Sequence, residues 1–144
     1  MTTILEPSRV TIANSLFDAF AAGDLRQWEA RLAPDFSFDY PGMPGGKGAA
    51  AARAYNEPFN AAFSDWKTEI HSSATTGDTT FLLMTVHATL SAPLVTPAGT
   101  LPATGSRGAV KCVLVSTIRD GKIQHEATYW NVPDLLAQIM PVDA

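Results

Sequence analysis

Residues 109–131 read AVKCVLVSTIRDGKIQHEATYWN, two extended apolar runs that meet at Asp120-Gly121. An Asp-Gly pair between such runs is the strongest short-range signal of a β-hairpin. Because side chains alternate along a strand, the second run places three residues on one face: Glu126, Thr128 and Trp130. A strand that only built a core would not need a carboxylate beside a tryptophan. The hairpin therefore predicts an antiparallel sheet and makes Glu126 the first candidate functional residue.

The composition is that of one ordinary domain spanning residues 1–144. Hydrophobic residues make up 46% of the chain, yet no apolar run approaches the ~18 residues that a membrane span needs. The first residues, MTTILEPSR, lack the charged start and apolar middle of a signal peptide. The single cysteine, Cys112, suits a reducing compartment. We expect a cytoplasmic protein that does not enter a membrane.

The charge pattern argues against several classes of partner. A net charge of −4 does not provide the basic face that nucleic acids require. The three histidines, His71, His87 and His125, stand apart without metal-ligand spacing, so we expect no metal site. No dinucleotide, P-loop or nucleophile-elbow motif is present, and we expect no cofactor. What remains as a partner is a small apolar molecule or a second copy of the chain.

The order of elements predicts the fold class. Apolar periodicity and capping residues predict helices over residues 8–22, 24–32, 48–63 and 133–140, with Pro58 kinking or dividing the third. β-Branched and apolar runs predict strands over residues 36–40, 66–73, 79–90, 109–119 and 123–130, the first closed by a PGMPGG turn. This order indicates an α+β fold in which a curved, mixed or antiparallel sheet wraps around three N-terminal helices. Such a curved sheet leaves a cone whose apolar inside can hold a ligand, and the loop over residues 91–108 is either a lid or a passive surface segment.

Several segments together resemble a known family. They are DLRQWEARLAPDFSFDYPG near the start, FNAAFSDWKTEI in the middle, APL and LPATGSRG in the long loop, and DGKIQHEATYWNVPDLLAQI at the end. The sequence is similar to the SnoaL-like polyketide cyclases within the nuclear-transport-factor-like superfamily of cone-shaped α+β barrels. The resemblance covers most of the chain and implies a pocket and usually a homodimer. It does not imply one reaction, because relatives include cyclases, steroid isomerases, dehydratases and epoxide hydrolases.

The chain departs from its relatives at the residues that carry their chemistry. Tyr40 stands where steroid isomerases place a carboxylate base, and leucines stand at their two oxyanion-donor positions, Leu16 and Leu114. This excludes the isomerase reaction. Many cyclase relatives end the last strand with Glu-His-Trp, and the matching residues here are His125, Glu126 and Ala127. Aldol chemistry of the usual kind therefore requires that Glu126 replaces the histidine.

Three residues are the catalytic candidates: Glu126, Tyr40 and Tyr55. If Glu126 faces an apolar interior, desolvation raises its pKa and it can act as an acid or a base. The tyrosines can hydrogen-bond a substrate oxygen. We expect the substrate-binding wall to include Trp130, Leu16, Phe20, Phe38, Phe59, Met84, Leu114 and Thr128. The alternative for the aromatic residues is plain core packing. The alternatives for Glu126 are a solvated position at the rim and a pairing with Lys111 on the neighbouring strand.

These residues favour a cofactor-independent polyketide cyclase of secondary metabolism that closes a carbon–carbon ring inside the pocket. Either Glu126 transfers a proton in an aldol-type closure, or the pocket confines a polyene so that a cycloaddition proceeds. The alternatives are a non-catalytic small-ligand binder or dimeric interaction protein of the same fold and, with less support, an epoxide hydrolase or a dehydratase. On the opposite strand faces lie His87, Phe81, Leu83, His125 and Tyr129, which predict a homodimer contact through the outer sheet face.

Overall fold

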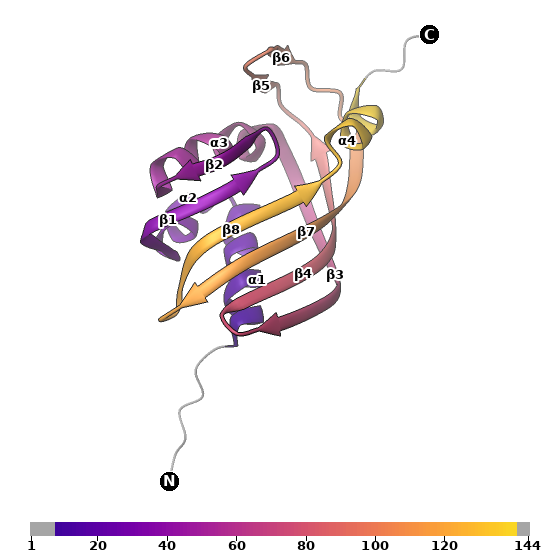
Figure 1. Cartoon of the computed structure of the whole chain (residues 1–144). Coiled ribbons are helices and arrows are strands. Elements are labelled where there is room, and N and C mark those ends of the chain that lie inside the picture. Colours follow the sequence, from indigo (N-terminus) through magenta and orange to yellow (C-terminus); the bar gives the residue numbers. More distant parts are fainter. Residues whose placement is uncertain (1–7, 141–144) are drawn as a thin grey trace.

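The computed structural model describes residues 8–140 (Figure 1). Its helices are α1 (Arg9–Ala21), α2 (Leu25–Ala30), α3 (Ala49–Ala62) and α4 (Val132–Ile139). Its strands are β1 (Leu32–Tyr40), β2 (Met43–Lys47), β3 (Phe63–Thr76), β4 (Thr79–Leu90), β5 (Leu94–Thr96), β6 (Gly99–Leu101), β7 (Arg107–Arg119) and β8 (Lys122–Trp130). The α+β class is confirmed, and so is the hairpin of β7 and β8 with which the sequence analysis began. Within this range no helix is both long and apolar enough to cross a membrane.

The two helices at the start follow from their capping residues. The Ser8 side chain accepts a hydrogen bond from the Thr11 amide at the beginning of α1. Gly23 adopts a φ of +76°, which a residue with a side chain rarely does, and this allows the chain to reverse after α1. Asp24 then accepts from the Gln27 amide and begins α2. The short connection places α2 directly against α1.

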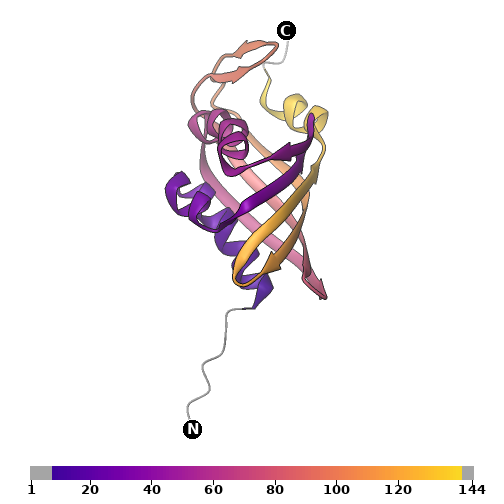
Figure 2. The same cartoon turned by 60° about the vertical axis from the view of Figure 1, so that its left-hand side comes forward.

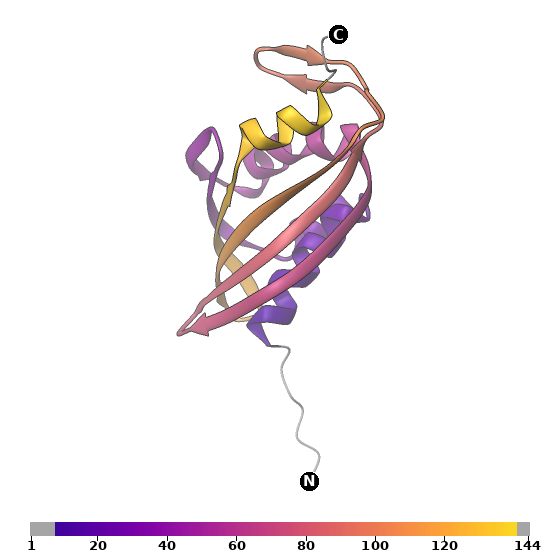
Figure 3. The same ribbon diagram turned by 90° about the vertical axis from the view of Figure 1, so that its right-hand side faces the viewer.

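Six strands form one curved sheet in the order β2-β1-β8-β7-β4-β3. All neighbours are antiparallel except β1 and β8, which run parallel, so the sheet is mixed. Figures 2 and 3 show the helices α1 and α3 on the inner side of its curve, with α4 and the β5–β6 hairpin gathered at one end. Side chains from the inner face pack against these helices to form the core, whose largest fully buried members include Phe36, Leu82 and Ile118.

The predicted cone-shaped barrel is not confirmed, because the sheet is open and β2 and β3 are its two edges. The three helices are also not one N-terminal group. Helices α1 and α2 precede β1, whereas α3 follows the β1–β2 hairpin. The curved sheet with helices on its inner side nevertheless leaves the space that the prediction assigned to a pocket.

Three local predictions need correction. The PGMPGG segment is more than a turn, since its second half forms β2 and pairs with β1. Gly46 permits this pairing, because a Cβ there would lie 2.2 Å from the ring of Phe38. Pro58 does not divide α3, which continues through it at the cost of one backbone donor. The long loop carries a small hairpin of its own, β5 and β6, with Leu94 buried against the domain.

Candidate active site

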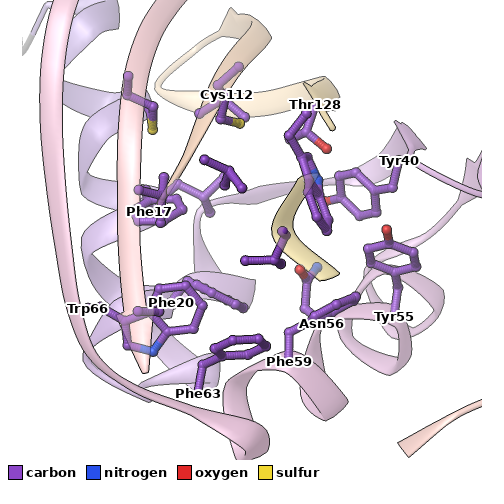
Figure 4. Close-up of a pocket in the computed structure, with 18 of the residues that line it drawn as sticks. Phe17, Phe20, Tyr40, Tyr55, Asn56, Phe59, Phe63, Trp66, Cys112 and Thr128 are labelled. Carbon is purple, nitrogen blue, oxygen red and sulfur yellow. The ribbon is translucent and has the colours of Figure 1, made fainter. Parts of the chain in front are cut away.

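A cavity of about 140 Å³ lies between the inner face of the sheet and the helices. Its lining is mostly aromatic and aliphatic, with a few polar side chains. Figure 4 shows Tyr40, Tyr55 and Asn56 toward one side and Phe20, Phe63 and Trp66 toward the other. Ring contacts confirm this division, since Tyr40 and Tyr55 are 4.9 Å apart and Phe20 and Trp66 are 5.1 Å apart between centroids. The cavity thus has a polar end and an aromatic end, as small-molecule pockets typically do.

Glu126 supplies the one acidic side chain of the cavity lining in residues 8–140. Strand parity on β8 turns it inward, together with Thr128 and Trp130, and leaves it only 5% exposed. The predicted alternative, a solvated position at the rim, is therefore wrong. Its Oε1 accepts a hydrogen bond of 2.9 Å from the Tyr40 hydroxyl, while its buried Oε2 has no hydrogen-bond partner. Burial raises the pKa of Glu126 to about 7, against the opposing effect of the Tyr40 hydrogen bond.

Tyr40 is positioned by the parallel pairing of β1 with β8. Phe38 lies opposite Glu126 in this ladder, and Tyr40, two residues further along the same face, reaches the carboxylate. Burial, followed by the neighbouring Glu126 charge and their hydrogen bond, raises the pKa of Tyr40 far above its usual range. The tyrosine therefore stays protonated, and its single proton is directed to Glu126.

Tyr55 lines the cavity from α3, but its hydroxyl has another partner. It donates a 2.8 Å hydrogen bond to the backbone carbonyl of Pro41, which follows β1. Burial raises the pKa of Tyr55 to about 12, so this proton is also retained at neutral pH. The structure brings Tyr55 beside Tyr40 as predicted and shows that its hydroxyl anchors α3 to the end of β1.

Asn56 is a polar residue of the cavity that the sequence analysis missed. It follows Tyr55 on α3, donates to the backbone carbonyl of Ala52 at 2.8 Å, and lies close enough to Tyr40 to oppose the rise of its pKa. The signal was present in the sequence, because Asn56 stands three residues before Phe59 and therefore on the same side of the helix.

Most of the predicted wall lines the cavity: Trp130, Leu16, Phe20, Phe59, Met84, Leu114 and Thr128. Phe38 does not, and this prediction is corrected. Its ring stacks on Tyr40 at 4.4 Å and lies near Phe36 at 5.9 Å, against the space that Gly46 leaves open. It shares the inner face of β1, but the β2 edge covers it. Further lining residues that were not predicted include Phe17, Phe63, Trp66 and Cys112.

The outer face of the same strand pair carries a second polar group. Ser37 Oγ lies 2.7 Å from His125 Nδ1, and His125 Nε2 lies 3.2 Å from Asp39 Oδ2. Asp39 also accepts a 2.7 Å hydrogen bond from the Gly45 amide, which supports the turn between β1 and β2. The His125 and Asp39 side chains are 37% and 44% exposed. This cluster is separated from the cavity by the sheet itself.

The chain belongs to the SnoaL-like family, since the model of the SnoaL-like domain matches residues 13–126. Comparison with curated proteins found no match. Among solved structures, a candidate SnoaL-like polyketide cyclase from Jannaschia sp. CCS1 is 16% identical with a TM-score of 0.80, over 99% of this chain and 100% of the other.

Two further structures show how broadly this fold is used. IdmH from Streptomyces antibioticus, a candidate polyketide cyclase, is 24% identical with a TM-score of 0.75, over 92% of this chain and 98% of the other. An LEH-like epoxide hydrolase from M. tuberculosis is 14% identical with a TM-score of 0.68, over 91% and 88%. At these identities the likeness establishes the fold, and the reaction must be argued from the cavity.

Proposed function

We propose that the protein is a cofactor-independent cyclase that closes a carbon–carbon ring in a polyketide-like substrate held in the cavity. The observation that carries this proposal is Glu126, a buried carboxyl whose pKa is about 7 and whose Oε2 has no protein partner. A group that is half ionised near neutral pH can both accept and return a proton. The family match and the aromatic lining support a bulky unsaturated substrate.

In an aldol-type closure, Glu126 Oε2 takes a proton from the carbon next to a substrate carbonyl. The resulting enolate attacks a second carbonyl of the same molecule, which forms the ring bond and leaves an alkoxide. The alkoxide then takes the proton back from Glu126. Because Tyr40 and Tyr55 donate their protons to Glu126 and Pro41, we assign them the positioning of the base and of α3, rather than direct contact with the oxyanion.

A second mechanism is favoured by the aromatic lining. Rings from α1, α3, β3 and β8 surround the cavity, including Phe20, Phe59, Trp66 and Trp130. Such walls can hold a polyene in a folded shape in which its ends react, so that a cycloaddition needs no proton transfer. Glu126 then acts only as a hydrogen-bond acceptor or donor.

The two mechanisms predict different results for Glu126→Gln. The purified protein is incubated with linear poly-β-ketone and polyene compounds, and products are separated by liquid chromatography with mass detection. Ring closure leaves the mass unchanged, and subsequent dehydration lowers it by one water. Acid–base catalysis predicts a loss of about 10²- to 10⁴-fold in Glu126→Gln, whereas confinement predicts a change below about tenfold. Glu57→Gln is the matched control, because Glu57 is an exposed partner of Arg53 on α3.

The alternatives are outcomes of the same experiment. A compound that binds and returns unchanged supports a non-catalytic binder. Epoxide opening requires an Asp-Arg-Asp set in the pocket, and the cavity lining within residues 8–140 contains no aspartate and no arginine. A product that gains one water would nevertheless overturn the cyclase proposal.

We further propose that two copies of this enzyme associate in the cytoplasm through the outer sheet face. Three large apolar residues there are notably exposed: Phe81 at 39%, Leu83 at 40% and Tyr129 at 60%. They belong to β4 and β8, on either side of β7. Light scattering coupled to size-exclusion chromatography should give twice the mass of one chain. In Leu83→Lys the measured mass should fall to that of a single chain. A wild-type protein that remains monomeric at high concentration would exclude this contact.

A further inference from the structure

The cavity contains one acceptor that the protein leaves unsatisfied. Glu126 Oε2 is fully buried without a hydrogen-bond partner, although buried carboxylate oxygens are normally paired. The other two buried side-chain atoms in this condition within residues 8–140, on His87 and Ser116, do not line the cavity. The orphan oxygen is thus specific to the space in which a ligand would lie.

The neighbouring donors do not serve this oxygen. The Tyr40 proton goes to the other carboxylate oxygen, and the Tyr55 proton goes to the Pro41 carbonyl. Asn56 donates to Ala52 within its own helix. A molecule entering the polar end therefore meets Glu126 Oε2 as a buried acceptor that has no partner within the protein.

The charge of the lining restricts what can enter. In the part of the chain that the structure describes, the lining holds no lysine, arginine or histidine, so an anion would face Glu126 without a counter-charge. An ammonium group brings three N–H donors to a single orphan acceptor, and the remaining donors would lie among apolar side chains. One hydroxyl, with one donor, matches the site.

We propose that the ligand of this cavity is an uncharged, flat unsaturated molecule that presents one enol or phenol hydroxyl to Glu126 Oε2 and places its apolar body toward Phe20 and Trp66. This assignment rests on the same cavity as the proposed function, and it names the group by which the substrate is recognised. The hydroxyl hydrogen of an enol belongs to the 1,3-dicarbonyl unit that an aldol closure uses. Transfer of the enol proton to Oε2 gives the same enolate as removal of the proton from carbon in the keto form, so recognition and chemistry involve one oxygen atom.

The test uses four naphthalene probes that differ only in one substituent. They are 2-naphthol, 2-methoxynaphthalene, 2-naphthoate and 2-(aminomethyl)naphthalene, each titrated into the full chain by calorimetry at pH 8. A hydrogen bond to a charged acceptor predicts that 2-naphthol binds at least about tenfold tighter than 2-methoxynaphthalene. The naphthoate and the amine should bind more weakly than the naphthol. Equal binding of naphthol and methoxynaphthalene, or tighter binding of either charged probe, would overturn the proposal.

Two further measurements locate the effect at Glu126. In Glu126→Leu the preference for naphthol should disappear while methoxynaphthalene still binds, and Glu57→Gln should behave as wild type. In the wild type the preference should grow between pH 6 and pH 8. The other titratable groups of the cavity are Tyr40 on β1, Tyr55 on α3 and Cys112 on β7, and burial raises the pKa of each. Only Glu126 is expected to change charge in this range.

The outcomes separate this inference from the proposed function. A naphthol preference that depends on Glu126, without turnover of any ketone or polyene, would retain the ligand assignment and remove the cyclase. Ring closure without such a preference would retain the cyclase and remove the assignment. A pH-independent preference, or one that survives in Glu126→Leu, would place recognition on another residue.

Discussion

The two faces of the β1–β8 junction carry similar side chains in very different surroundings. On the inner face a hydroxyl and a carboxylate, Tyr40 and Glu126, meet at 2.9 Å with almost no exposure. On the outer face Ser37, His125 and Asp39 form hydrogen bonds of 2.7 and 3.2 Å in contact with solvent. Both groups join the same two strands, and their members alternate along them.

The difference shows what burial adds to a hydrogen bond. On the outer face, water competes for each polar atom and screens the His125–Asp39 pair, so the cluster contributes little beyond holding the strands. On the inner face there is no such competition, and the pKa of Glu126 rises to about 7. Residue types alone would rank the Ser-His-Asp cluster as the more reactive. The cavity, however, lies beside the inner pair.

The largest expected effect concerns Glu126 and pH. The folded state holds the Glu126 proton more tightly than the unfolded state, whose pKa is near 4.5. The Glu126 proton therefore contributes on the order of 3 kcal/mol to the free energy of unfolding. This contribution is fully present below pH 4.5 and is lost as the pH rises through about 7. Glu126→Gln should lose this slope in urea denaturation between pH 5 and pH 8. Parallel curves for the variant and the wild type would contradict the burial of a titrating carboxyl, and Glu57→Gln serves as the control.

A second test disturbs the packing behind the inner pair. A Cβ at Gly46 would overlap the ring of Phe38, which stacks directly on Tyr40. Gly46→Ala should lower the free energy of unfolding by about 2 kcal/mol, a typical cost of overpacking. Gly45→Ala does not provide a clean control, because Gly45 has a φ of +69°, so we compare with Ala50→Ser at an exposed position in the first turn of α3. An unchanged stability of Gly46→Ala would show that Phe38 and β2 move freely.

Removal of the Tyr40 hydroxyl sharpens the comparison without changing the fold. Tyr40→Phe leaves the Glu126 carboxylate with no donor, so the pKa of Glu126 should rise further above about 7. NMR titration of labelled glutamate side chains measures this value. A fall in the pKa would mean that water enters and solvates the carboxylate once the hydroxyl is gone.

The smallest effect is expected on the outer face. His125→Ala removes both hydrogen bonds of the exposed cluster and should cost about 1 kcal/mol or less. The pKa of Glu126 should remain near 7, because the backbone ladder between Phe38 and Glu126 holds the inner pair. If the pKa of Glu126 changes in His125→Ala, the two faces are coupled and His125 positions the carboxylate from behind.

Strand periodicity was sufficient to predict much of this site. Alternation along β8 predicted that Glu126, Thr128 and Trp130 face the same side, and all three line the cavity. The same alternation predicted that His125 and Tyr129 lie on the outer face. The helical spacing of Tyr55 and Phe59 was equally informative. These predictions succeeded because one buried face imposes a strict register on each element.

The features that the sequence did not predict depend on contacts between segments that are distant in the chain. Phe38 has the correct parity for the cavity, but a glycine on a neighbouring strand gives its ring another place. The strand β2 was hidden in a segment rich in proline and glycine, whose composition suggests a turn. The Tyr40–Glu126 hydrogen bond depends on a parallel pairing of strands that no local pattern reveals. Sequence patterns indicate which way a side chain points, but they do not identify what it meets.

The parallel pairing of β1 with β8 also has a consequence for how the protein folds. Tyr40 and Glu126 are separated by 86 positions along the chain, so their contact closes a very long loop. The backbone entropy of that loop is lost only when the last strand docks, and contacts of such sequence separation slow folding. The cavity is therefore complete only when β8 has paired with β1 and β7. A nascent chain that lacks β8 also lacks Glu126, Thr128 and Trp130, which form one side of the cavity.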